Sequence, residues 1–304
     1  MTSSALAGIV APVLTPFTAS GDADAGRFVA HARWLLAEGC TALAPFGTTS
    51  EGNSLSVAER KVLLISLLAA DVDPAQLLPG TGVCSAPETV DLTKHAVELG
   101  CAGVLMLPPF YYKGIGDEGL YRYFAQVIER VADSRLRVYL YHIPQMTQVG
   151  FSLKLIERLR KDFPLTVVGI KDSSGDWANT KMMIEALPGF QVFTSAETSL
   201  LECVRLGGAG CISATANLNA RMMRQIFDAP ATADALQATA SAVRKEIQAK
   251  PLITATKSLL AHYRQDATWR NTRAPLEPFA ADDASGLAKR LAALGFKLDF
   301  PPDT

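Results

Sequence analysis

Short apolar runs alternate along this chain with longer segments whose apolar residues recur at the spacing of a helix. The runs are short and partly β-branched, which favours buried strands, and glycine or polar clusters follow many of them. The spacing from one run to the next, roughly 25 to 35 residues, is typical of a (β/α)8 barrel. We predict strands at residues 8–14, 41–45, 77–80, 103–107, 137–141, 165–171, 191–194 and 210–213.

The segments between these runs, and those after the last of them, have the periodicity of amphipathic helices. Ser56 followed by Glu59 predicts a capping box at one helix start. Beyond the eighth strand the pattern predicts helices at residues 235–248, 251–262 and 283–294. The predicted fold class is therefore α/β: a (β/α)8 TIM barrel over residues 1–225 with a C-terminal helical extension over residues 226–304. An open doubly wound sheet would also alternate, but no Gly-x-Gly-x-x-Gly turn follows the first strand.

The composition of the chain excludes several classes of function. Of 304 residues, 49% are hydrophobic and 19% are charged, and the net charge is −1. No long basic run is present, so we expect neither nucleic acid nor membrane as a partner. The five cysteines form no Cys-x-x-Cys pair, which argues against a zinc site and for a reducing compartment. The amino terminus does not resemble a signal peptide, so we expect a cytoplasmic protein that binds no metal.

Lys171 is the first candidate for chemistry, because it stands at the end of a predicted buried strand. The polar cluster Asp172 to Gly175 that follows it is typical of a loop. An amine held in apolar surroundings keeps a larger neutral fraction and can attack a ketone to form an imine. The alternative is a strand-end lysine whose ammonium group reaches solvent.

Further polar residues follow other predicted strands. In a barrel the loops after the strands all open on one face, and active sites lie there. Each residue alone is weak support, since a buried tyrosine is more often part of the core. Their convergence on the face that holds Lys171 is the signal. The candidates are Thr48, Thr49, Tyr111, Tyr141, Ser195, Glu197, Ile212 and Ser213.

These residues stand in motifs that resemble the dihydrodipicolinate synthase and N-acetylneuraminate lyase family. The motifs extend from Gly8 to Leu276, over nearly the whole chain. The resemblance implies a Schiff-base lyase that acts on pyruvate or another 2-oxo acid, needs no cofactor and assembles as a homotetramer, a dimer of dimers. The motifs that carry it are Gly47-Thr-Thr-x-Glu51, Pro-Phe-Tyr111, Tyr141-x-x-Pro144, Gly169-Ile-Lys-Asp-x-Ser-Gly175 and Leu206-Gly-Gly-x-Gly-x-Ile-Ser213.

The same resemblance implies roles for individual residues. Lys171 would form the imine with the 2-oxo group, and Tyr141 would move the proton to or from the aldehyde oxygen. Thr48 and Tyr111 would relay that proton, with Tyr111 reaching in from a neighbouring subunit.

Other residues would bind the substrate. Thr48 and Thr49 would hold its carboxylate, and the carbonyl of Ile212 would complete that pocket. Ser195 replaces a glycine of the family and adds a hydroxyl to the pocket. Glu197 stands where sugar-acid lyases of the family carry an acidic residue that accepts hydrogen bonds from substrate hydroxyls, and a solvated loop carboxylate is an equally open alternative.

One departure from the family bears on the substrate. Members that condense pyruvate with aspartate semialdehyde carry an arginine five residues after the catalytic tyrosine, and Met146 stands there in this chain. A thioether cannot replace a guanidinium that grips a carboxylate. We therefore expect an aldolase that cleaves a 2-keto-3-deoxy sugar acid, or a similar hydroxylated 2-oxo acid, to pyruvate and an aldehyde.

Three alternatives stay open at this point. One is a 4-hydroxy-tetrahydrodipicolinate synthase with an altered carboxylate grip, and another is a dehydratase or deaminase that uses the same imine. The third, of another class, is a catalytically silent barrel that only binds 2-oxo acids. The presence of both Lys171 and Tyr141 counts against the third alternative, because a pure binder needs neither.

Overall fold

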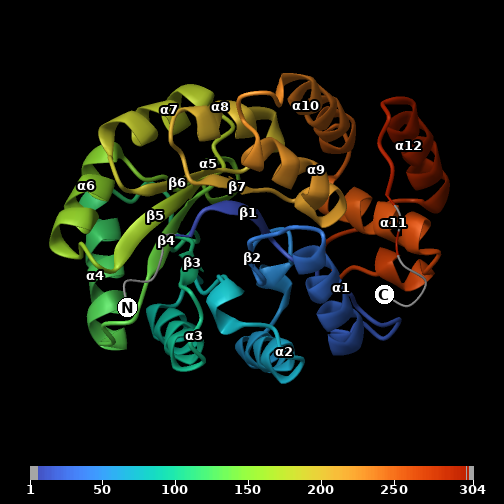
Figure 1. The fold of residues 1–304 in the computed structure, drawn as a ribbon. Coiled ribbons are helices and arrows are strands. Elements are labelled where there is room, and N and C mark those ends of the chain that lie inside the picture. The colour runs from blue at the N-terminus through green and yellow to red at the C-terminus, as the bar shows by residue number, and fades with distance from the viewer. Residues whose placement is uncertain (1–5, 299, 301–304) are drawn as a thin grey trace.

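The structure, a computed structural model, describes residues 6–298 and 300. Its centre is a parallel sheet of seven strands in the order β2-β1-β7-β6-β5-β4-β3 (Figure 1). The strands occupy predicted positions, although most are shorter than the apolar runs that predict them. They are β1 (Gly8–Ala11), β2 (Ala42–Leu43), β3 (Val104–Met106), β4 (Val138–His142), β5 (Val167–Asp172), β6 (Gln191–Thr194) and β7 (Gly210–Ile212).

The predicted strand at residues 77–80 does not form a regular strand, but it closes the barrel. Leu77 makes an isolated parallel bridge to Leu43 of β2, and Gly80 makes one to Leu105 of β3. The Leu78 amide donates to the Leu43 carbonyl at 2.8 Å. The segment therefore fills the eighth place between β2 and β3, and the (β/α)8 prediction is confirmed with this local correction.

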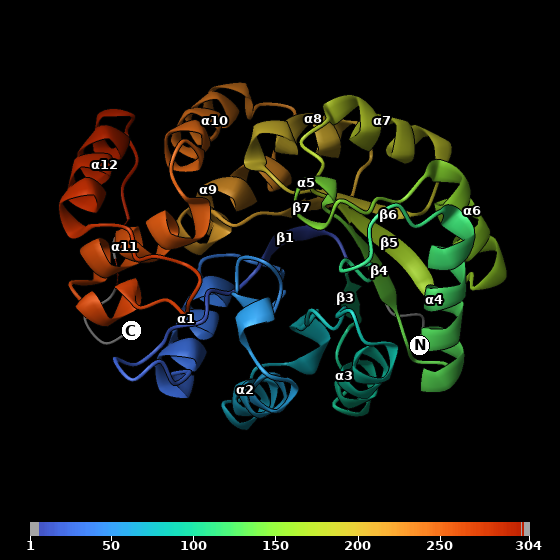
Figure 2. The ribbon, with the colours of Figure 1, turned by 180° about the vertical axis from the view of Figure 1, so that it is seen from behind.

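Helices surround the strands, and both views show them as an outer layer (Figures 1 and 2). The predicted capping box at the start of α2 is present, because Ser56 and Glu59 bond to each other's backbone amides. The barrel helices are α1 (Ala25–Ala37), α2 (Val57–Ala69), α3 (Ala86–Glu98), α4 (Asp117–Val131), α6 (Leu153–Asp162), α7 (Trp177–Ala186), α8 (Leu200–Arg205) and α9 (Ala216–Asp228), with a single turn α5 (Pro144–Thr147) after β4 and short 3-10 helices η1 (Gly52–Ser54), η2 (Pro74–Gln76) and η3 (Glu197–Ser199).

The strands divide their side chains between two cores, as their pleat requires. In β4, Val138 and Leu140 pack against the outer helices. Tyr139 and Tyr141 belong to the core inside the barrel. Gly169 of β5 makes room for this inner core, since a Cβ there would lie 2.6 Å from the Tyr139 ring.

Three further helices form the predicted C-terminal extension: α10 (Asp234–Gln248), α11 (Leu252–Arg264) and α12 (Ala281–Ala293). Both views show them together on one side of the barrel (Figures 1 and 2). The 3-10 helix η4 (Ala267–Arg270) lies between α11 and α12 in the sequence. The predicted boundary between residues 225 and 226 falls near the end of α9, and the division into two units stays a prediction. No helix in the described ranges, 6–298 and 300, meets the length and hydropathy of a membrane span.

A buried ion pair joins the extension to the loop after β2. Lys257 of α11 pairs with Glu51, and both side chains are inaccessible to solvent. The ammonium group also donates to the Thr15 carbonyl at 2.9 Å and lies 4.6 Å from the centre of the Phe17 ring. Burial lowers the pKa of Lys257, and the charge of Glu51 opposes that shift. This contact fixes the loop that carries Thr48 and Thr49.

We predict that Lys257→Met destabilises the fold, because it leaves the Glu51 carboxylate buried without a counter-ion. Removing one partner of a buried pair costs about 3 to 5 kcal/mol. The control is Lys61→Met, which breaks the partly exposed pair of Lys61 with Asp91 and should cost at most about 1 kcal/mol. Urea unfolding measures both variants. Equal midpoints for the two would show that the buried pair does not anchor the extension.

Candidate active site

Lys171 and Tyr141 lie side by side on adjacent strands. The parallel pairing of β4 with β5 sets Tyr141 opposite Lys171. Both residues are buried, with 4% of Lys171 and 3% of Tyr141 exposed. The Lys171 Nζ lies 4.4 Å from the centre of the Tyr141 ring. The strand register therefore delivers a buried amine and a phenol to one place at the carboxyl ends of the strands.

Thr48 joins this pair from the loop after β2. The Tyr141 hydroxyl donates a hydrogen bond to Thr48 Oγ1 at 3.2 Å. The loop is a tight turn, in which the Gly52 amide donates to the Gly47 carbonyl at 3.0 Å. A Cβ on Gly52 would lie 2.0 Å from the Phe46 carbonyl oxygen, so only glycine fits there. The turn holds Thr48 at the end of a hydroxyl pair that can pass a proton.

A cavity of about 370 Å³ opens over these residues. It holds six of the nine residues that the sequence analysis placed at the site, namely Thr48, Thr49, Tyr141, Lys171, Ser195 and Ile212. Its size suits a small organic acid. The other lining residues come from the loops after β4, β5 and β7 and from the extension: Ile143, Gln145, Met146, Ser173, Ala214, Arg244, Pro251, Leu252, Ile253, Thr254 and Leu276.

Tyr111 is not brought to the cavity of its own chain. Its side chain is 74% exposed. Its ring packs edge-on against that of Tyr112, with centroids 5.3 Å apart. The predicted role of Tyr111, which requires a neighbouring subunit, stays a prediction.

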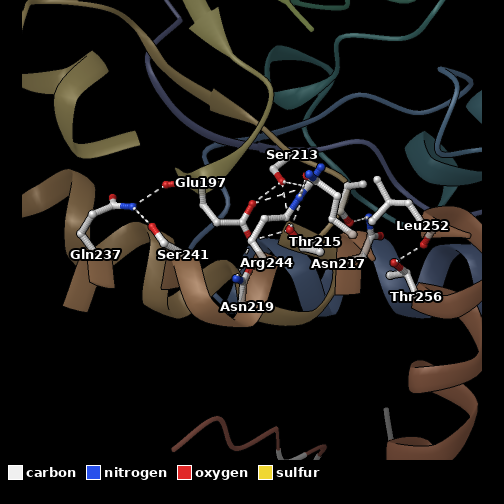
Figure 3. A network of polar contacts seen from close by, with 12 residues as sticks. Glu197, Ser213, Thr215, Asn217, Asn219, Gln237, Ser241, Arg244, Leu252 and Thr256 are labelled. Carbon is white, nitrogen blue, oxygen red and sulfur yellow. Dashed lines mark hydrogen bonds and ion pairs between the residues drawn. The ribbon is translucent and has the colours of Figure 1, made fainter. Parts of the chain in front are cut away.

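Glu197 lies behind the cavity wall, which corrects the expectation that it binds substrate directly. The residue is 0% exposed and does not line the cavity. Its carboxylate accepts hydrogen bonds from the Ser213 hydroxyl at 2.7 Å and the Asn219 amide at 2.9 Å. It also accepts one from Thr215 and lies 3.6 Å from Arg244 (Figure 3). With its oxygens bonded internally, Glu197 serves the structure of the site.

Arg244 is the site residue that sequence reasoning missed. It stands on α10, in the extension, and reaches the cavity wall next to Ser213. No motif marks it, because a single arginine in an amphipathic helix is most simply a solvated residue. Gln145 and Met146, on the turn α5, also line the cavity.

The loop after Lys171 is fixed by hydrogen bonds to Asp172. The carboxylate of Asp172 accepts from the Ser174 amide at 2.9 Å and from the Thr180 hydroxyl at 2.7 Å. His142 accepts from the Phe151 amide at 3.1 Å and does not line the cavity, so it has a structural role. Burial lowers the pKa of His142, and the charge of Asp172 opposes that shift.

The geometry suits chemistry that uses an amine as nucleophile. The amine is buried, a phenol–hydroxyl pair lies beside it, and the cavity admits a ligand. Such an arrangement can form a covalent adduct with a ketone and move a proton next to it. Within the described part of the chain, no cluster of three or more His, Cys, Asp or Glu side chains could hold a metal ion.

Comparison with known proteins shows similarity over almost the full chain. A family model described as the dihydrodipicolinate synthetase family matches residues 5–294. An uncharacterized DapA-like lyase of Chloroflexus aurantiacus is 33% identical over 285 residues, which are 92% of this chain and 94% of that protein.

Two solved structures share the fold. The crystal structure of dihydrodipicolinate synthase from Agrobacterium tumefaciens has a TM-score of 0.88 and 33% identity, covering 94% of this chain and 99% of that one. YagE from Escherichia coli K12, described as a member of the dihydrodipicolinic acid synthase family and solved in complex with pyruvate, has a TM-score of 0.85 and 28% identity. That comparison covers 95% of this chain and 98% of YagE.

We predict that Glu197→Ala destabilises the protein without any ligand, because it leaves the buried Arg244 without its counter-ion. The expected loss is about 3 to 5 kcal/mol. Ser195→Ala, two residues away on the cavity wall, should change stability by at most about 0.5 kcal/mol. Denaturant midpoints of the two variants give the comparison. A Glu197→Ala protein as stable as the wild type would show that Glu197 does not stabilise the fold as the counter-ion of Arg244.

Proposed function

The chain belongs to the dihydrodipicolinate synthetase family, whose members are aldolases and lyases, and from this premise we propose that it is a class I aldolase that forms a Schiff base between Lys171 and a 2-oxo acid. One observation carries the proposal: the buried Lys171 amine lies beside the hydrogen-bonded pair of Tyr141 and Thr48 in an open cavity. The complex of YagE with pyruvate supports a 2-oxo acid as the ligand.

In this mechanism the neutral amine of Lys171 attacks the keto carbon of the substrate, and loss of water gives the imine. The protonated imine accepts the electron pair of the carbon–carbon bond next to the keto carbon when that bond breaks. The hydroxyl of the departing carbon gives up its proton and becomes an aldehyde. The resulting enamine takes up a proton, and hydrolysis releases pyruvate and regenerates the amine.

Tyr141 takes the proton from the substrate hydroxyl in the cleavage direction. A free phenol has a pKa of about 10, so the proton must pass on to a second group. Thr48 supplies that group, 3.2 Å away. Tyr111 of a neighbouring subunit extends the relay, which accounts for its exposure in the single chain. Thr48 and Thr49 hold the carboxylate of the substrate, and the carbonyl of Ile212, also on the cavity wall, completes that pocket.

The substrate we propose is a 2-keto-3-deoxy sugar acid or a similar hydroxylated 2-oxo acid, which is cleaved to pyruvate and an aldehyde. Ser195 adds a hydroxyl to the cavity wall, and Met146 stands at the position of the family arginine. The second candidate is condensation of pyruvate with aspartate semialdehyde. The 33% identity with the Agrobacterium dihydrodipicolinate synthase favours it. We further propose a cytoplasmic homotetramer.

We predict that borohydride reduction in the presence of pyruvate attaches one reduced pyruvate unit to Lys171. Reduction converts the imine to a stable secondary amine, so the adduct survives peptide mapping by mass spectrometry. Lys171→Met should show no adduct. An unchanged intact mass of the treated wild type would rule out the mechanism.

We predict that Tyr141→Phe keeps imine formation but loses turnover, because the phenol moves the proton and does not form the covalent bond. Loss of a general acid or base lowers kcat by about 100-fold or more. Tyr121→Phe, which alters a tyrosine bonded to Asp162 at the surface of α4, is the matched control. Pyruvate release measures turnover, and borohydride trapping measures the imine. Undiminished turnover in Tyr141→Phe would remove the tyrosine from the proposed relay.

A further inference from the structure

In the described part of the chain, two basic side chains and no acidic ones line the cavity. Among the described residues that line it, the basic ones are Lys171 and Arg244, and none is aspartate or glutamate. A pocket walled in this way attracts anions. In the proposed mechanism Lys171 becomes part of the imine, and the carboxylate next to the keto group binds to the Thr48–Thr49 turn. Arg244 is then the remaining basic group on the described cavity wall that can bind another part of the substrate.

Arg244 is held rigidly from behind. Its Nε donates to Gln248 at 3.0 Å, and its Nη1 donates to the Ser213 hydroxyl at 3.0 Å and to the Thr215 hydroxyl at 3.2 Å. Glu197 lies 3.6 Å away as its buried counter-ion. Figure 3 shows Arg244 in one network with Glu197, Ser213 and Thr215. Only 6% of the residue is exposed. A guanidinium fixed in this way loses little entropy when it binds a further anion.

One terminal nitrogen of this guanidinium, Nη2, makes no hydrogen bond to the described residues. Arg244 donates hydrogen bonds through Nε and Nη1, and Nη2 has no hydrogen-bond partner among the described residues. Since Arg244 lines the cavity, its remaining N–H groups are available to a ligand there. An arginine beside a carboxylate oxygen forms a strong, charge-assisted hydrogen bond.

We propose that Arg244 binds a second carboxylate of the substrate, on the half that leaves as the aldehyde. This proposal rests on the proposed function and narrows it: among the hydroxylated 2-oxo acids proposed above, the substrates are those with a further carboxylate at the end remote from the keto group, and Arg244 removes the argument from Met146 against such a carboxylate. Arg244 bonds to Ser213 next to β7, whereas Lys171 stands on β5, with β6 between them. The guanidinium therefore meets the ligand from the extension side of the cavity.

The position of Arg244 explains how this chain can bind a second carboxylate without an arginine at position 146. Met146 lines the same cavity and is 63% exposed. It contributes apolar surface where a guanidinium would otherwise grip the leaving half. Arg244 supplies the guanidinium from a different element, so the methionine does not exclude an acidic aldehyde.

The test compares two substrates that differ at one end: a 4-hydroxy-2-oxo acid with a terminal carboxylate and its analogue with a terminal hydroxymethyl group. Pyruvate release gives kcat/KM for each. Wild type should prefer the diacid. Arg244→Gln should lose at least about tenfold in kcat/KM on the diacid, and the analogue should change by less than about threefold. On the diacid, the kcat/KM of Arg244→Lys should lie between the values of wild type and Arg244→Gln.

Arg290→Gln is the matched control, because Arg290 pairs with Glu246 on the exposed surface of the extension. It should keep the wild-type preference. Borohydride trapping of pyruvate on Lys171 in every variant separates this proposal from the aldolase assignment: absence of the adduct in wild type removes the proposed function itself. An intact adduct with equal losses on both substrates would overturn the role of Arg244. If Arg244→Gln does not fold, a wild-type preference for the hydroxymethyl analogue overturns it instead.

Discussion

The parallel pairing of β4 with β5 is the constraint on which the site depends. It sets Tyr141 opposite Lys171, with the amine 4.4 Å from the centre of the phenol ring. A slip of one residue in either strand would turn one side chain into the outer core, because successive strand residues point to opposite faces. Gly169, two residues before Lys171, allows Tyr139 to fill the barrel below the site. Packing in the barrel core therefore fixes the register of β4 against β5, and this register places Tyr141 beside Lys171.

The C-terminal extension contributes two buried cations to the barrel. Lys257 pairs with Glu51 in the turn that carries Thr48, and Arg244 pairs with Glu197 behind β7. Desolvating such charges is costly, so buried pairs serve position and specificity better than they serve stability. Lys257 holds a loop that touches the substrate in the proposed mechanism. Arg244 lines the cavity itself. The extension thus completes the site as well as covering one side of the barrel.

Much of this arrangement could be predicted from local patterns. The apolar runs predicted the strands. Because the loops after the strands of a barrel open on one face, Thr48, Tyr141 and Lys171 were predicted to lie together there. Residues 77–80 hold the eighth place through isolated bridges, a detail of backbone geometry that propensity does not encode. Glu197 and Arg244 could not be interpreted from sequence, since burial and pairing arise only when α10 packs beside the barrel. The role of Tyr111 depends on a second chain that no local pattern specifies.

The proposed chemistry requires a covalent bond between Lys171 and a 2-oxo acid. A crystal structure of the wild-type enzyme soaked with pyruvate tests it most directly. We predict continuous electron density from Lys171 Nζ to the keto carbon of the ligand, with the ligand carboxylate on the Thr48–Thr49 turn. Pyruvate bound in the cavity at van der Waals distance from Nζ, in crystals of enzyme that turns over normally, would contradict the account.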